Sequence, residues 1–134
     1  MSTHELGATV LHLSPEDRAV AMPGGAWFWH QMMSGQFEDE RVAGVATGGW
    51  LVTRFTHSGD WPHWDMHPEG DEVLTALSGS CTFHLEREEG IEQIVLSAGH
   101  TLIVPRGVWH RATGDEPTEI FALTAGKRTQ HRPA

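Results

Sequence analysis

The stretch GDWPHWDMHPEGDEVLTALSG, residues 59–79, has the most informative spacing in the chain. A glycine stands at each end, and Asp65, His67 and Glu72 lie between them. Alternate side chains of an extended strand share a face, so we expect Asp65 and His67 on the same side. Because imidazoles beside carboxylates are common ligands of divalent metals, the stretch predicts a binding site as well as strands.

A second stretch bounded by glycines, GHTLIVPRGVWHRATG at residues 99–114, has a related construction. Its Pro105-Arg106-Gly107 turn ends one strand, and His110 lies near the start of a later strand. In a closed barrel, this histidine and the three ligand candidates of the first stretch could converge near the mouth, where ligand sites commonly lie.

The chain around these stretches predicts an all-β domain. Short apolar runs are separated by glycine, proline and acidic turns between about Val45 and Leu123. The clearest hairpin joins Cys81–Arg87 to Ile91–Leu96, and alternation along its first strand places Cys81 in the core as an unreactive residue. The other expected strands are Gly49–Thr56, Trp61–His67, Glu72–Leu77, Thr101–Val104, Trp109–Thr113 and Glu119–Thr124.

We divide the chain into three parts. Residues 1–44 are expected to contain an N-terminal strand and a short helix that packs on the barrel, residues 45–125 the barrel, and residues 126–134 a C-terminal tail. The strand is expected at Ala8–Leu13. The helix is expected at Ala26–Met33, ended by Gly35, with Trp27, Phe28 and Met32 in the core.

Composition excludes several classes of function. The net charge of −9 argues against a nucleic-acid partner. No apolar run is long enough to span a membrane, and the first residues do not resemble a signal peptide. A single cysteine permits no intrachain disulfide, so we expect a cytoplasmic setting. The motifs of serine hydrolases, CxxC pairs and HExxH are absent from the sequence.

Together the two stretches resemble the motif segments of the cupin superfamily, G-x5-H-x-H-x3,4-E-x6-G and G-x5-P-x-G-x2-H-x3-N. The sequence departs from this pattern at two positions. Asp65 stands where the first motif begins its histidine pair, and Gly114 stands where the second motif ends in asparagine. The two segments cover residues 59–114, somewhat under half of the chain.

The resemblance implies a small jelly-roll (double-stranded β-helix) barrel, often paired as a homodimer. It implies a divalent ion, Zn, Fe, Mn or Ni, held by His67, Glu72 and His110 with Asp65 as an altered fourth ligand. Two imidazoles and a carboxylate leave coordination positions open for a substrate. A competing hypothesis is an empty polar cavity, in which Asp65 pairs with Arg54 or Arg106 and the two histidines only form hydrogen bonds.

Further residues are expected to border the cavity. His63 shares the strand face of Asp65 but lies some 13 Å from His67 along the strand, which favours a place at the rim. Arg54 could hold a substrate carboxylate or lie at a solvated edge. Phe55 and Phe121 are expected to line the barrel. Trp61, Trp64 and Trp109 flank the ligand candidates, and strand alternation turns the last two outward. His57, His84 and His100 are expected on the surface or in loops.

Two functional hypotheses remain open on the sequence. The first is a metal-dependent enzyme, an oxygenase or an isomerase or lyase, that acts on a small organic molecule, with Glu72 or Asp65 moving protons. The second is a non-catalytic binding or sensing cupin with a degenerate or empty metal site. The identity of the ligand is beyond what either motif segment indicates.

Overall fold

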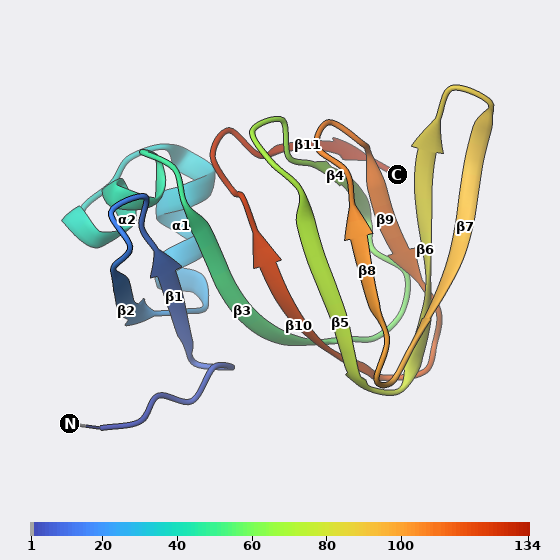
Figure 1. Cartoon of the computed structure of the whole chain (residues 1–134), viewed down its shortest axis with the longest axis horizontal. Helices are drawn as coiled ribbons and strands as arrows, with labels where there is room; N and C mark the ends of the chain where they lie inside the picture. Colours follow the sequence, from blue (N-terminus) through green and yellow to red (C-terminus); the bar gives the residue numbers. More distant parts are fainter. Residues whose placement is uncertain (1) are drawn as a thin grey trace.

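The computed structural model describes residues 2–134 and arranges most of them in two antiparallel β-sheets (Figure 1). The six-stranded sheet has the order β2-β1-β3-β10-β5-β8, and the five-stranded sheet has the order β11-β4-β9-β6-β7. The strands are β1 (Thr9–Leu13), β2 (Ala19–Pro23), β3 (Trp50–His57), β4 (His63–Met66), β5 (Glu72–Ser78), β6 (Ser80–Arg87), β7 (Gly90–Ser97), β8 (Thr101–Val104), β9 (His110–Thr113), β10 (Thr118–Thr124) and β11 (Gln130–Pro133). Two facing antiparallel sheets agree with the predicted jelly-roll class.

The main core lies between the two sheets. Alternate residues of the facing strands point inward, as the sequence pattern of the predicted hairpin requires. Cys81 is only 4% exposed there, which confirms the prediction that it packs in the core, and burial raises the pKa of its thiol. The buried residues of this core are Leu74, Ala76, Cys81, Phe83, Leu85, Leu96, Val104, Ala112, Ile120 and Ala122.

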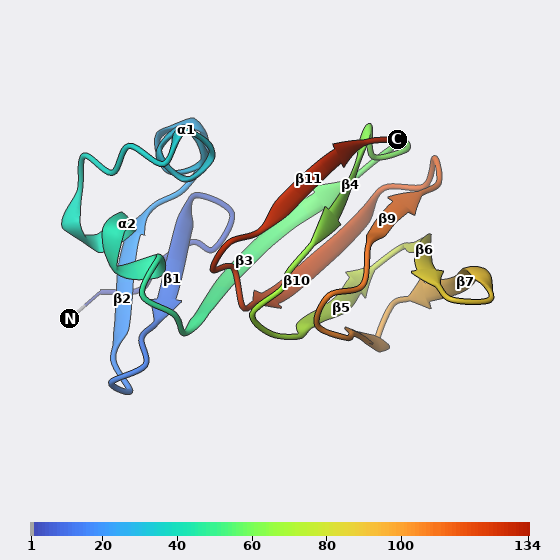
Figure 2. The same ribbon diagram turned by 90° about the horizontal axis from the view of Figure 1, so that it is seen from above.

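A second, smaller core lies at the end of the six-stranded sheet that β1 and β2 form (Figure 2). The helices α1 (Ala26–Ser34) and α2 (Glu40–Val45) lie there beside β1 and β2. Phe28 of α1 is fully buried, but Trp27 is 38% exposed and lies under the guanidinium of Arg41, so its predicted place in the core is wrong. None of the helices formed by residues 2–134 is long and apolar enough to cross a membrane.

Two features of the backbone bear on the site. Gly79 turns the chain from β5 into β6 with a φ of 76°, and a Cβ there would lie 2.2 Å from the carbonyl oxygen of Pro117. Only glycine fits such a position. The second feature is β11, which pairs with β4 through the register His131↔Asp65. The segment 126–134, expected to be a tail, therefore contains a strand of the five-stranded sheet.

Candidate metal centre

Three buried side chains meet in the space between the sheets. His67, Glu72 and His110 each offer a ligand atom, and these atoms lie within 4.8 Å of one another. Glu72 begins β5 and His110 begins β9, so the two sheets each supply a residue, while His67 follows the end of β4. The burial of all three shields the group from water. We refer to this group as the Glu72 cluster.

The Glu72 carboxylate lies between the two imidazoles. Its Oε1 is 2.9 Å from Nε2 of His110, and its Oε2 is 3.3 Å from Nε2 of His67. The hydroxyl of Thr124 donates a hydrogen bond to Oε2 at 2.5 Å. Both carboxylate oxygens therefore face imidazole nitrogens, and neither is directed to solvent.

Hydrogen bonds on the far side of each ring determine which nitrogen faces Glu72. The hydroxyl of Thr129 donates to the carbonyl oxygen of Gly126 at 2.9 Å, so its oxygen accepts from Nδ1–H of His67 at 2.8 Å. His110 donates from Nδ1 to the carbonyl oxygen of Val108 at 3.1 Å. In the neutral form, each ring therefore directs the lone pair of Nε2 toward Glu72, as a metal ligand must.

The acid–base properties of the cluster follow from these contacts. Burial alone would raise the pKa of Glu72, but the neighbouring imidazoles of His110 and His67 hold it well below its usual range. Burial alone would lower the pKa of His110, but its hydrogen bond to Glu72 and the charge of that carboxylate raise it. Without a bound ion, the negative charge of Glu72 is stabilised by the proton that this carboxylate shares with His110.

One buried atom of the Glu72 cluster makes no hydrogen bond within residues 2–134. Nε2 of His67 is fully buried and makes no hydrogen bond among the described residues. Buried polar atoms are nearly always paired, so an unpaired one calls for a specific explanation. Together with Glu72 and His110, this nitrogen completes a set of two imidazoles and one carboxylate, which suits zinc or a first-row transition metal. The residues present therefore fit a divalent cation.

A comparison with known proteins identifies the family. The family model described as "Cupin domain" matches residues 52–124, which include both glycine-bounded stretches and the whole Glu72 cluster. The chain belongs to the cupin family. A relative named uncharacterized protein YdbB, from Bacillus subtilis (strain 168), is 30% identical to this cupin over 80 residues. That match covers 60% of each protein, so the chain spans only 60% of the relative's length.

Solved structures show the same fold at low sequence identity. The cupin matches Bacillus subtilis oxalate decarboxylase, a protein with Mn(II) centres, with a TM-score of 0.52 and 18% identity over 63% of this chain and 23% of the other. It matches hydroquinone 1,2-dioxygenase from Sphingomonas sp. TTNP3, with 4-hydroxybenzoate bound, with a TM-score of 0.50 and 17% identity over 57% of this chain and 60% of the other.

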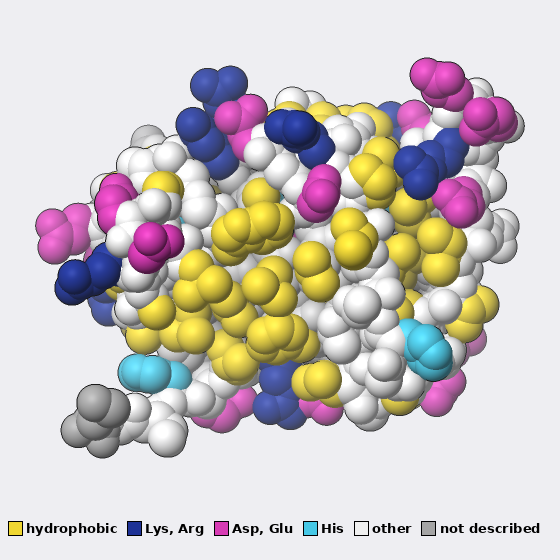
Figure 3. All heavy atoms as spheres, in the orientation of Figure 1, with side chains coloured by type: hydrophobic (Ala, Val, Ile, Leu, Met, Phe, Trp, Pro, Cys, Tyr) yellow, Lys and Arg dark blue, Asp and Glu magenta, His cyan; other side chains and the backbone are white. Residues whose placement is uncertain are grey.

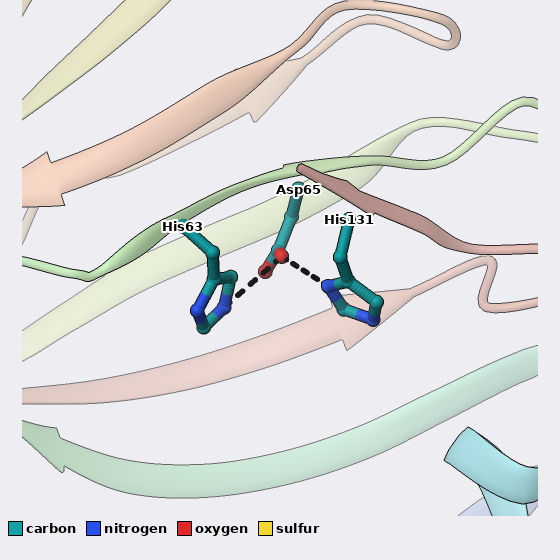
Figure 4. A group of neighbouring side chains, drawn as sticks. All are labelled: His63, Asp65 and His131. Carbon is teal, nitrogen blue, oxygen red and sulfur yellow. Dashed lines mark hydrogen bonds and ion pairs between the residues drawn. The ribbon is translucent and has the colours of Figure 1, made fainter. Parts of the chain in front are cut away.

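Asp65 of this cupin lies outside the Glu72 cluster. Its Oδ1 faces Nδ1 of His131 at 2.6 Å and Nε2 of His63 at 3.2 Å (Figure 4). The strand β4 ends at Met66, so the alternation expected to place Asp65 and His67 on one face does not extend to His67. The alternative pairing of Asp65 with Arg54 or Arg106 does not occur either. His131 was not predicted from the sequence, because residues 126–134 carry no strong strand pattern.

The register of the six-stranded sheet places the other predicted cavity residues. Phe55 pairs with the buried Ile120, and it packs against the main core with its ring 6.4 Å from that of Trp61. Arg54 pairs with Phe121, one residue out of step, so both lie on the opposite, outer face. Arg54 forms an ion pair there with Glu119. Phe121 therefore does not line the cavity as predicted, and of the two places considered for Arg54 the structure has the solvated one.

The three tryptophans that flank the ligand candidates divide between the two faces of the five-stranded sheet. Trp61 lies inside, with its ring centroid 6.2 Å from that of His63 and 6.5 Å from that of His110. Trp64 and Trp109 are held on the other face by the guanidinium of Arg132, as strand alternation predicts. Trp61 therefore supplies an aromatic wall beside the histidines.

Two open hollows on the surface lie away from the Glu72 cluster. One, of about 730 Å³, lies along the turn between β6 and β7, and four of its eight lining residues are glutamates. The other, of about 280 Å³, is bordered by Glu5, Gly7, Arg54, Phe55, Thr56 and Glu119. Neither is lined by a residue of the cluster, so the ligand geometry, not the shape of a hollow, identifies the site.

His57 is a further correction. It was expected on the surface, but it is 3% exposed, and its Nε2 makes no hydrogen bond in the described part of the chain. It belongs to the inward-facing residues of β3, with its ring 6.0 Å from that of Trp61. Burial lowers its pKa, because the charged imidazolium is poorly solvated there.

Proposed function

We propose that this cupin is a metal-dependent enzyme acting on a small organic molecule, with a divalent ion held by His67, Glu72 and His110. The observation that carries the proposal is the buried, unpaired Nε2 of His67, which faces a carboxylate shared with a second imidazole. The candidate ions remain Zn, Fe, Mn and Ni. Structural neighbours that share the fold include a decarboxylase with Mn(II) centres and a dioxygenase, which support this choice of class.

The residues around the ion have separate roles in this proposal. A bound divalent ion would supply Lewis acidity to a substrate oxygen. Glu72 acts as a ligand, because both of its oxygens already face partners. As long as it binds no ion itself, Asp65, whose side chain is 18% exposed, holds or moves a proton at Oδ1. Trp61, whose ring lies beside those of His63 and His110, excludes water there and provides an apolar surface for the substrate.

Metal analysis tests this proposal directly. Untagged protein is incubated with Mn, Fe, Ni or Zn, dialysed, and analysed by mass spectrometry beside the double variant His67→Ala/His110→Ala. We expect the Glu72 cluster to hold one equivalent of metal that the double variant loses. Equal metal content in both proteins would remove these residues from the ligand set. His100→Ala is the matched control, because His100 is exposed and lies outside the cluster.

A non-catalytic binding cupin is the alternative. The Glu72 carboxylate accepts hydrogen bonds from His110 and Thr124, so its charge is stabilised even without an ion. If no metal binds to the wild-type protein after reconstitution, the site is an empty polar cavity, and the protein is better studied as a small-molecule binding module.

We further propose that the protein forms a homodimer through the outer face of the six-stranded sheet. One cross-strand row on that face is apolar on all six strands: Ala21, Leu11, Val52, Leu123, Val73 and Ile103. Ile103 is 59% exposed, and apolar side chains cover much of this face (Figure 3). A patch of this kind is typical of a protein interface, and a second copy offers the same surface.

Light scattering tests the dimer. The expected mass is about twice the 14.8 kDa of one chain, and Ile103→Glu should reduce it to the monomer mass by placing a charge in the patch. The substitution Glu92→Gln, on an exposed position of the other sheet, is the control. A wild-type mass of one chain would contradict the proposal.

A further inference from the structure

A second group of metal-ligand side chains lies beside the Glu72 cluster and is not part of it. His63, Asp65 and His131 place one ligand atom each within 4.8 Å of the other two. Both imidazoles approach the same carboxylate oxygen, Oδ1 of Asp65, from opposite sides (Figure 4). We refer to this group as the Asp65 cluster.

Strand pairing builds the Asp65 cluster. His131 of β11 lies directly opposite Asp65 of β4, and His63 lies two residues before Asp65 on the same face of β4. Asp65 in turn lies opposite His110 of β9. The cross-strand row His131, Asp65, His110 therefore places the Asp65 cluster next to the Glu72 cluster on the inner face of the sheet.

The charge of Asp65 has no permanent counterion. Its ion-pair partners among residues 2–134 are the two imidazoles, and it pairs with no lysine or arginine. Arg132, which follows His131 in the chain, faces the opposite side of the sheet, where it pairs with Glu86 and lies over Trp109. A bound cation would compensate the charge of this largely buried carboxylate.

We propose that His63, Asp65 and His131 form a second divalent-cation site, with zinc as the best-suited ion. Two imidazoles and a carboxylate are a common zinc ligand set that leaves one position for water. Ligand atoms around tetrahedral zinc lie roughly 3.3 Å apart. The distance from His63 to Asp65 is already 3.2 Å, while the 2.6 Å distance from His131 to Asp65 has to open by roughly 0.7 Å.

Both histidines of the Asp65 cluster can adjust to an ion. The side chains of His63 and His131 are 42% and 35% exposed, so solvent reaches them and neither is locked by packing. His63 is nevertheless oriented, because its ring stacks on Trp61 at 24° between planes. Each ring has a second nitrogen that can carry the proton when the first binds the ion.

Zinc titration of four untagged proteins tests the proposal, with bound zinc measured after equilibrium dialysis. These are the wild type, His131→Gln, His67→Ala/His110→Ala and the triple variant that combines the substitutions. Glutamine at position 131 can still donate a hydrogen bond to Asp65 but is a poor zinc ligand, so it retains the contact between β4 and β11. Thermal unfolding monitored by circular dichroism checks that each protein is folded.

The expected zinc content is two equivalents for the wild type, one for His131→Gln, one for His67→Ala/His110→Ala and none for the triple variant. One equivalent in the wild type that survives in His67→Ala/His110→Ala but not in His131→Gln would support the Asp65 site and contradict the proposed function. If His131→Gln binds as much zinc as the wild type, the Asp65 site is refuted, whatever the Glu72 cluster binds. His100→Ala must behave as wild type.

Discussion

Replacing Thr129 by valine should weaken metal binding at the Glu72 cluster without touching a ligand atom. The Thr129 hydroxyl accepts from Nδ1–H of His67 because it donates to the carbonyl oxygen of Gly126. Valine has nearly the same shape but no acceptor. The neutral His67 ring could then move its proton to Nε2 and donate to Glu72, and this tautomer cannot bind a metal.

The loss of metal affinity can be estimated, because the substitution costs a hydrogen bond mainly in the metal-bound protein. With metal on Nε2, the proton of His67 must stay on Nδ1, so Thr129→Val leaves a buried donor unpaired in the bound state. Leaving such a donor unsatisfied costs about 1–3 kcal/mol. The metal-free protein avoids most of this cost by changing tautomer. The dissociation constant should therefore rise about 10- to 100-fold.

The assay is a zinc titration against a competing chelator in the His131→Gln background, so that only the Glu72 cluster is measured. Thr129→Ser should restore wild-type affinity, because serine keeps the hydroxyl. The matched control is Thr113→Val, which removes a similar 2.8 Å hydrogen bond to His84, a histidine outside both clusters. An unchanged affinity in Thr129→Val, or an equal loss in Thr113→Val, would refute the reasoning.

Three further predictions concern stability and are measured by urea denaturation of the metal-free protein. Phe83→Ala should lower the free energy of unfolding by about 3–5 kcal/mol, because Phe83 is fully buried in the main core; a loss below about 1 kcal/mol would contradict the core described here. Gly79→Ala should destabilise more than Gly99→Ala. Both glycines have a positive φ, which costs alanine about 1–2 kcal/mol at either position. Only at Gly79 would the new Cβ also meet a backbone oxygen. Equal losses of stability in the two variants would argue against that close approach. The pKa of His57 is lowered in the folded state, so the unfolded chain binds more protons below about pH 6.5, and stability should fall as the pH drops toward the folded pKa. His57→Gln should lose less stability than the wild type between about pH 7.5 and pH 5, and an identical pH dependence in both would exclude this role of His57.

Local sequence patterns were sufficient to predict the part of the fold that holds the Glu72 cluster. The alternation of Cys81, Phe83 and Leu85 reports burial directly, so the β6–β7 hairpin and the core residues were predictable. The glycine-bounded spacing predicted that Glu72 and His110 come together, although 38 residues separate them. A helix was expected at Ala26–Met33, and α1 spans Ala26–Ser34.

Other features depend on pairings that no local pattern reveals. Asp65 was expected beside His67, but β4 ends at Met66, so the two side chains take separate directions. His131 lies 66 residues from Asp65 in the chain, and the short strand that carries it has three exposed residues out of four and no apolar alternation. The position of Arg54 on the outer face depends on its register with Phe121. Strand register is a tertiary property, and a shift of one residue reverses which face a side chain occupies.

The pairing of β4 also limits which insertions the gene could tolerate. This strand is joined to β9 by a single residue pair, Asp65↔His110, and to β11 by four. One extra residue in the loop before His63 would allow β4 to slip by one position. The slip would turn Trp64 inward and Asp65 outward. A change in loop length would then replace a row of ligand side chains with an indole, although every residue of both clusters would still be present in the sequence.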